Sequence, residues 1–96
     1  MQVTMTIEDL GTLLRIWRSQ AKMTTRDVSE RVSDALGRKI SYMTVTRYEN
    51  NEFPREGPEA AMLVALTVAL GHRVSDLPVE NQDSVQKLSD LILRNR

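Results

Sequence analysis

The sequence predicts an all-α protein built from five helices. Apolar residues recur at helical spacing in five separate stretches, and no stretch shows the strict apolar–polar alternation of a half-buried strand. Polar caps, glycines or prolines stand between the stretches, at the points where helices begin and end. The 96 residues are enough for one compact domain and too few for two, so we expect residues 1–96 to form a single domain.

The composition excludes several classes of protein. The chain has no cysteine, which rules out disulfides, thiolate metal sites and cysteine nucleophiles. His72 stands without a cysteine or a second histidine, so we expect no metal site, and no motif indicates a cofactor. No apolar run reaches the roughly 18–20 residues of a membrane helix, and the first residues lack the pattern of a signal peptide. We therefore expect a cytoplasmic protein that does not enter a membrane.

Charge is balanced overall and unevenly distributed. The formal net charge is zero, which argues against a basic protein that coats nucleic acid indiscriminately. Residues 12–55 nevertheless carry nine Lys or Arg and five Asp or Glu, a net charge of +4, whereas residues 56–96 carry a net charge of −2. This pattern suits one face directed toward phosphate and another toward protein, and it is equally compatible with ordinary scatter in a small chain.

The first two predicted helices begin at recognisable caps. Thr6-Ile-Glu-Asp9 has the form of a capping box, with Asp in place of the usual Glu or Gln. The cap of the second helix is Thr24 or Thr25, Asp27 suits its N-terminal dipole, and Gly37 ends it. The side chains expected on the buried faces are Ile7, Leu10, Leu13, Leu14, Trp17 and Ala21 in the first helix and Val28, Val32, Ala35 and Leu36 in the second.

The remaining helices follow a short connection over residues 38–40. Ser41 caps a short third helix with Val45 and Tyr48 facing inward, and Asn50-Asn51 ends it, since Asn tolerates the left-handed conformation. Pro58 suits the first position of a fourth helix that runs to Leu70 and is apolar nearly all round, which requires cover on several sides. Gly71 ends this helix, Ser75-Asp76-Leu77 forms at most a short turn, and a last helix spans about 83–94.

The outward face of the third helix carries the most informative side chains. With Val45 and Tyr48 inward, Tyr42, Met43, Thr46 and Arg47 must point outward, and Thr44 lies at the boundary. An exposed Tyr-Met pair is unusual on a merely solvated face. In a DNA major groove the same set is useful, because Arg can donate two hydrogen bonds to guanine, Thr can form a hydrogen bond or touch a thymine methyl group, and Tyr and Met offer apolar contact.

These elements together resemble the Cro/CI-type helix-turn-helix family, also called lambda-repressor-like or XRE. The resemblance covers about Leu13 to Leu77 and rests on the order of its parts, which are Arg18, Thr24-Thr25, Val28 and Val32, Ser41 through Tyr48, Glu49-Asn50-Asn51, Pro54, and Pro58 through Leu70. Two features depart from the family pattern. Residues 33–39 intervene where the family has a close turn, so the second helix is longer or the turn is wider, and Asn51 replaces the usual glycine.

The resemblance implies a five-helix lambda-repressor-like domain over residues 6–77 with an additional C-terminal helix over 78–96. It also implies a largely buried ion pair between Arg18 and Glu49 that ties the first helix to the end of the third. The base-contacting residues would be Tyr42, Met43, Thr44, Thr46 and Arg47. The phosphate-contacting residues would be Thr25, Arg26, Arg38, Lys39, Ser41, Asn51 and Arg55, although each is also explained as a cap or a solvated charge.

The C-terminal helix is the expected dimerisation element. One helix-turn-helix covers about one half-site, and small regulators gain affinity by pairing on a palindrome. The chain has more apolar helix surface than one small core easily covers, and the last helix presents an apolar stripe of Val85, Leu88, Leu91 and Ile92. The alternative is that this stripe closes the core of the monomer.

The sequence therefore predicts a sequence-specific DNA-binding transcription regulator, a repressor of bacterial or phage origin that binds a palindromic operator as a homodimer. A close variant is the antitoxin of a toxin–antitoxin operon, which would add a protein partner. A different class is a helical adaptor that binds proteins through Tyr42, Met43 and the fourth helix. We do not expect an enzyme, because no nucleophile–base set or phosphate-binding loop is present.

Overall fold

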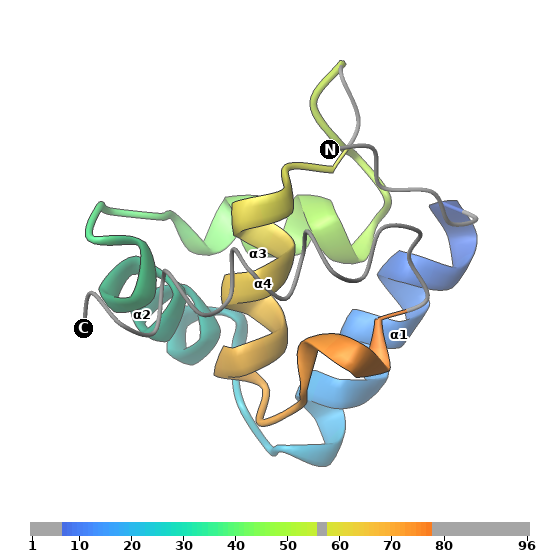
Figure 1. Cartoon of the computed structure of the whole chain (residues 1–96), viewed down its shortest axis with the longest axis horizontal. Coiled ribbons are helices and arrows are strands. Elements are labelled where there is room, and N and C mark those ends of the chain that lie inside the picture. Colours follow the sequence, from blue (N-terminus) through green and yellow to red (C-terminus); the bar gives the residue numbers. More distant parts are fainter. Residues whose placement is uncertain (1–6, 56–57, 78–96) are drawn as a thin grey trace.

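The structure is a computed structural model that describes residues 7–55 and 58–77. Within these ranges the chain is all-helical, as expected, and contains no strand (Figure 1). Its elements are α1 (Ile7–Gln20), α2 (Thr25–Leu36), α3 (Tyr42–Glu49), α4 (Ala60–Ala69) and a short 3-10 helix, η1 (Val74–Asp76). Thr6 and the expected last helix, with Val85, Leu88, Leu91 and Ile92, lie outside the described residues. No helix in the described part of the chain has the length and apolarity needed to cross a membrane.

The ends of α2 follow from local side-chain chemistry. Thr24 is the N-cap: its hydroxyl accepts from the Asp27 N–H at 3.1 Å, and the Asp27 carboxylate accepts from the Thr24 N–H at 3.0 Å. This reciprocal capping box satisfies two backbone donors that the helix leaves unpaired, and it selects Thr24 over Thr25 as the cap. At the other end Gly37 adopts φ +67°, a conformation that glycine takes without steric cost.

The connection between α2 and α3 is fastened onto α2. The Ser33 hydroxyl accepts from the Ile40 N–H at 2.8 Å and also lies 2.7 Å from the Ser29 carbonyl oxygen, to which it donates. Ser41 then begins α3, because its hydroxyl accepts from the Met43 N–H at 2.9 Å. Residues 33–36 therefore lengthen α2, and the turn itself is residues 37–41. One serine thus anchors this turn to the last part of α2.

The end of α3 is held against α1. Asn51 takes φ +62°, the left-handed conformation expected of it, and its side-chain oxygen accepts from the Gly11 N–H at 2.9 Å. A Cβ on Gly11 would lie 2.5 Å from the Glu49 carbonyl oxygen and 2.6 Å from the Asn51 side-chain oxygen. The absence of a side chain at Gly11 thus allows α1 to approach the last turn of α3.

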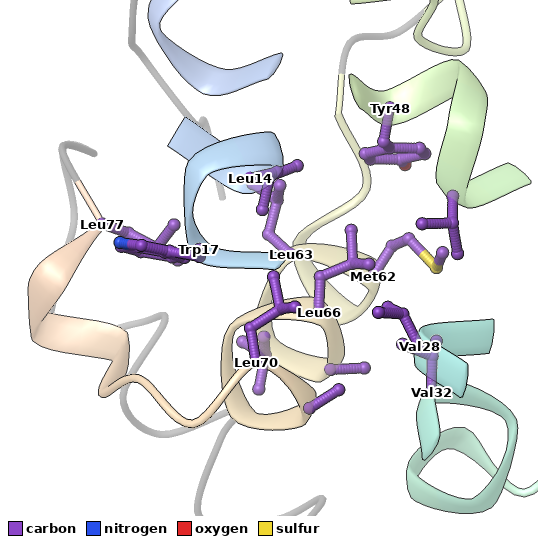
Figure 2. Packing of buried hydrophobic residues seen from close by; sticks show 14 of the residues in the cluster. Leu14, Trp17, Val28, Val32, Tyr48, Met62, Leu63, Leu66, Leu70 and Leu77 are labelled. Carbon is purple, nitrogen blue, oxygen red and sulfur yellow. The ribbon is translucent and has the colours of Figure 1, made fainter. Parts of the chain in front are cut away.

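Helix α4 runs through the middle of the molecule and forms the core with its neighbours (Figures 1 and 2). All six residues from Met62 to Thr67 are buried, and the Thr67 hydroxyl satisfies itself by donating to the Leu63 carbonyl at 2.7 Å. Around α4 lie Leu10, Leu14 and Trp17 from α1, Val28 and Val32 from α2, Val45 and Tyr48 from α3, and Val74 and Leu77 beyond it. The chain itself therefore covers α4, and the apolarity of this helix is not surplus surface that a second protomer must bury.

Two expected helix boundaries are wrong. Helix α4 begins at Ala60, not at Pro58, because the Glu59 N–H donates to the Tyr48 hydroxyl at 3.2 Å and Glu59 becomes the N-cap. Helix α1 ends at Gln20, so Ala21 lies beyond it and is exposed. Lys22 follows with φ +56°, which turns the chain toward α2.

Candidate nucleic-acid interface

The inward face of α3 fixes this helix to the rest of the molecule. Val45 and Tyr48 are buried as expected, and Glu49 is only 7% exposed. The Tyr48 ring packs edge-on against Phe53, with ring centroids 5.3 Å apart, and burial raises the pKa of its hydroxyl. The opposite face of α3 is consequently presented outward in one orientation.

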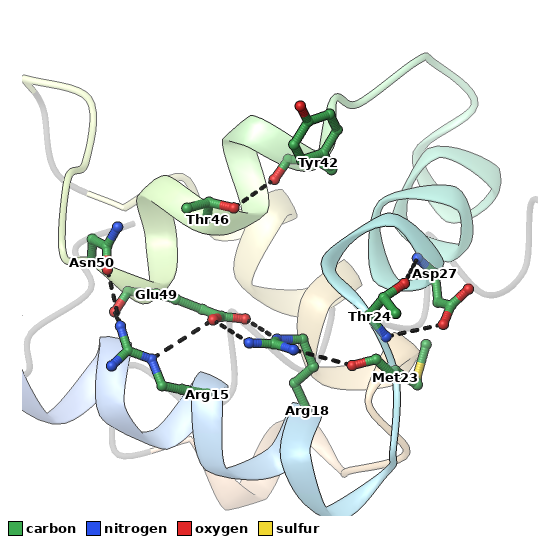
Figure 3. Close-up of polar contacts among 9 residues, drawn as sticks. All are labelled: Arg15, Arg18, Met23, Thr24, Asp27, Tyr42, Thr46, Glu49 and Asn50. Atoms are coloured by element: carbon green, nitrogen blue, oxygen red, sulfur yellow. Dashed lines mark hydrogen bonds and ion pairs between the residues drawn. The ribbon is translucent and has the colours of Figure 1, made fainter.

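Arg18 and Glu49 form the ion pair that the resemblance implies (Figure 3). Arg18 Nε and one of its terminal nitrogens donate to the two Glu49 carboxylate oxygens at 2.5 and 3.0 Å, the two-point geometry that suits a guanidinium and a carboxylate. The hydrogen bond with Glu49 raises the pKa of Arg18 above its ordinary value. The other terminal nitrogen donates to the Met23 carbonyl at 3.1 Å, so this arginine joins α1, the turn before α2 and the end of α3.

Arg15, which sequence reasoning did not assign to the site, also contacts the end of α3 (Figure 3). Its Nη2 donates to the Asn50 side-chain oxygen at 2.9 Å and to the Glu49 carbonyl at 3.4 Å, and its Nε lies 3.8 Å from the Glu49 carboxylate. Arg15 precedes Arg18 by three residues and therefore lies on the same face of α1. That spacing was the available signal, because both side chains then face the Glu49-Asn50 end of α3.

The expected base-contacting residues divide into exposed and half-buried side chains. Tyr42 and Met43 are 39% and 46% exposed, and Arg47 is exposed with no side-chain partner among the described residues. Thr46 is half-buried and its hydroxyl donates to the Tyr42 carbonyl at 3.1 Å, which leaves its methyl group and oxygen lone pairs for a ligand. Thr44 is half-buried, as its boundary position implied, in a hollow that it shares with Arg47, Phe53 and Pro54.

The N-terminal ends of α2 and α3 border an open groove of about 530 Å³. Arg26, Lys39, Ser41 and Tyr42 line it, together with Ile40 and one side of α2 that includes the acidic residues Glu30 and Asp34. The Arg26 guanidinium carbon lies 4.7 Å from the centre of the Tyr42 ring, a cation–π contact that orients both side chains. Thr25, the first residue of α2, is half-buried. Four of the expected contact residues therefore meet around this groove.

Three expected phosphate contacts lie elsewhere. Arg38 pairs with Glu59 at 3.2 Å, and both side chains are more than half exposed, so this surface pair contributes little stability and can open. The Asn51 side-chain oxygen accepts from the Gly11 N–H, and its amide nitrogen is the group that can donate to a phosphate. Arg55 is exposed in the loop after α3.

The remaining aromatic cluster has a structural explanation. Trp17 is buried and stacks on His72, with ring centroids 4.0 Å apart, while His72 Nδ1 lies 3.6 Å from the Asp76 carboxylate. Within residues 7–55 and 58–77 no group of three His, Cys, Asp or Glu side chains is placed to hold a metal ion. This cluster closes the core between α1 and η1.

Comparison with known proteins adds no assignment. The chain matches no protein-family model, no curated protein and no solved structure.

Proposed function

We propose that the protein is a sequence-specific DNA-binding transcription regulator in which α2 and α3 act as a helix-turn-helix. In this mechanism α3 enters the major groove, Arg47 reads a guanine, and Tyr42, Met43 and Thr46 contact neighbouring base edges. Thr25 and Arg26 in the first turn of α2, together with Lys39 and Ser41 before α3, contact the phosphates and thereby position α3.

One observation carries the proposal: buried groups fix the inward face of α3, and within residues 7–55 and 58–77 its outward face is exposed. Its inward residues include Val45, Tyr48 and a carboxylate held by two arginines. Its outward face presents Tyr42, Met43 and an Arg47 side chain that has no partner in the part of the chain that the structure describes. Two of the three large apolar side chains that are exposed in the described residues lie on this one turn. A rigid helix with a chemically mixed exposed face is what direct base readout requires.

The charges around α3 support binding to a polyanion. Arg26, Lys39 and Arg47 are exposed around it, and none of them forms an ion pair within the part of the chain that the structure describes. The formal net charge of zero limits indiscriminate binding, so affinity would depend on this local face. We further propose that the regulator is a repressor of bacterial or phage origin, because its sequence resembles the Cro/CI-type helix-turn-helix family.

The proposed assembly is a homodimer on a palindromic operator. A single α3 of eight residues reads about one half-site, and pairing doubles the contacts. The interface would be the C-terminal stripe of Val85, Leu88, Leu91 and Ile92. Since α4 is covered within the chain, the dimer proposal rests on this stripe alone.

Selection from a pool of random duplex DNA tests the proposal. We expect enrichment of one motif with two related halves. Recovery of no motif would refute the DNA function and favour the adaptor, for which the exposed Tyr42 and Met43 are the supporting observation. The same selection with Arg47→Ala, which lacks the exposed guanidinium, should recover a motif with altered base preference at one position in each half.

A further inference from the structure

The cluster at the end of α3 carries a surplus positive charge. Glu49 brings one negative charge, and Arg18 already neutralises it through two hydrogen bonds of 2.5 and 3.0 Å. Arg15 approaches the same carboxylate only to 3.8 Å and lies 57% exposed, against 25% for Arg18. The three side chains together therefore present one net positive charge, and it is Arg15 that exposes this charge to solvent.

Arg15 is also held in place by contacts that leave some of its N–H donors available. Its Nη2 is anchored to Asn50 and to the Glu49 carbonyl, at the negative end of the α3 dipole. A guanidinium has five N–H donors, and within the described residues Nη1 has no partner for its two. An arginine fixed through one edge has lost most of its side-chain freedom already, so binding an anion at the other edge costs little further entropy.

A second fixed arginine lies at the opposite end of α3. Arg26 is held over the Tyr42 ring at the N-terminal end, whereas Arg15 is held by Asn50 at the C-terminal end. The eight residues of α3 span about 12 Å along the helix axis. The major groove is about 12 Å wide and admits one α-helix with its side chains, so the phosphate backbones flank a helix that enters it and come within reach of a cation fixed at either end.

We propose that Arg15 is a phosphate-contacting residue that binds the DNA backbone beside the C-terminal end of α3, while Arg26 binds the backbone beside its N-terminal end. The inference rests on the proposed DNA function and adds a residue from α1 to the interface. In this arrangement Glu49 has two roles. Its carboxylate attaches α3 to α1 through Arg18, and its backbone carbonyl helps to orient the Arg15 side chain. Arg15 supplies affinity for the DNA backbone and no preference for sequence.

The test compares Arg15→Gln with Arg73→Gln, which removes the same charge from an exposed residue at η1, away from α3. Fluorescence anisotropy measures binding of each variant and of the wild type to a selected duplex and to an unrelated duplex of equal length, between 50 and 200 mM salt. Arg15→Gln should weaken both duplexes by the same factor. Its log–log salt slope should be shallower by about 0.9, so its affinity falls about 3.5-fold less than that of the wild type across this range. Arg73→Gln should match the wild type, and Arg15→Lys should restore the slope.

The possible failures can be told apart. If the wild type binds no duplex, the DNA function fails and the role of Arg15 fails with it. If the wild type binds but Arg15→Gln keeps the wild-type salt slope, the function stands and Arg15 only supports α3, even where affinity falls. Thermal unfolding of each variant reports that structural effect separately.

Discussion

Replacing Glu49 with alanine removes the carboxylate through which Arg18 joins α1 to α3. Breaking a buried pair by deleting one partner costs about 3–5 kcal/mol, because the other charge is left unpaired. Here Arg18 is 25% exposed and keeps its bond to the Met23 carbonyl, so water can replace part of what is lost. We therefore expect the free energy of unfolding to fall by about 2–3 kcal/mol, which lowers the melting temperature of a domain of this size by roughly 8–24 °C.

Urea denaturation and calorimetry of Glu49→Ala measure this loss, and Glu52→Ala is the matched control. Glu52 is an exposed acid three residues further along, with no ion pair in the described residues, so its removal should change stability by less than about 0.5 kcal/mol. Replacing both partners with apolar residues, as Arg18→Met with Glu49→Leu, should cost less than Glu49→Ala alone, because no charge is stranded. Equal stability of Glu49→Ala and Glu52→Ala would refute the anchoring role of the pair.

Three further predictions concern α1, α2 and the C-terminal stripe. Gly11→Ala should lower the free energy of unfolding, measured by urea denaturation, by about 1–3 kcal/mol, because its methyl carbon would lie 2.5 Å from the Glu49 carbonyl oxygen. Alanine normally stabilises a helix relative to glycine, so a stabilised variant would contradict this packing. Hydrogen bonds from Thr24 lower the pKa of Asp27, so its stabilising contribution is complete above the ordinary pKa near 3.9 and is lost as pH falls through the lowered value. The stability difference between the wild type and Asp27→Asn should therefore shrink below about pH 4, and a constant difference from pH 7 to pH 2 would be inconsistent with it. The double variant Leu88→Asp with Leu91→Asp should sediment as a folded monomer. A variant that stays dimeric would show that the interface lies elsewhere, and loss of helical circular dichroism would indicate that the stripe closes the monomer core.

Features set by local chemistry could be predicted from the sequence. A threonine cap for α2, the left-handed Gly37 and Asn51, and the Ser41 cap each depend on residues within a few positions of one another. The sequence left the cap open between Thr24 and Thr25, and the capping box with Asp27 was not predicted. Helical spacing also predicted the burial of Leu10, Leu14, Trp17, Val28 and Val32, whereas Ala21 is exposed because α1 ends before it.

Features set by contacts across the chain could not be predicted in the same way. Gly11 and Asn51 are 40 positions apart, and nothing near Gly11 indicates that the end of α3 will lie against it. Helix α4 begins at Ala60 and not at the predicted Pro58, because the Tyr48 hydroxyl accepts a hydrogen bond from the Glu59 N–H. The pair of Arg38 with Glu59 is equally a result of tertiary packing.

The most direct test of DNA reading by α3 measures Arg47 base pair by base pair. The wild type and Arg47→Ala are titrated against the selected duplex and against its single-base-pair variants, at one salt concentration. The wild type should lose about 1–3 kcal/mol of binding free energy at each contacted position, and Arg47→Ala should be insensitive at one of these positions while it keeps the others. An Arg47→Ala profile identical in shape to that of the wild type would contradict base reading by Arg47, and a wild type that binds the selected and unrelated duplexes equally would contradict the proposed function.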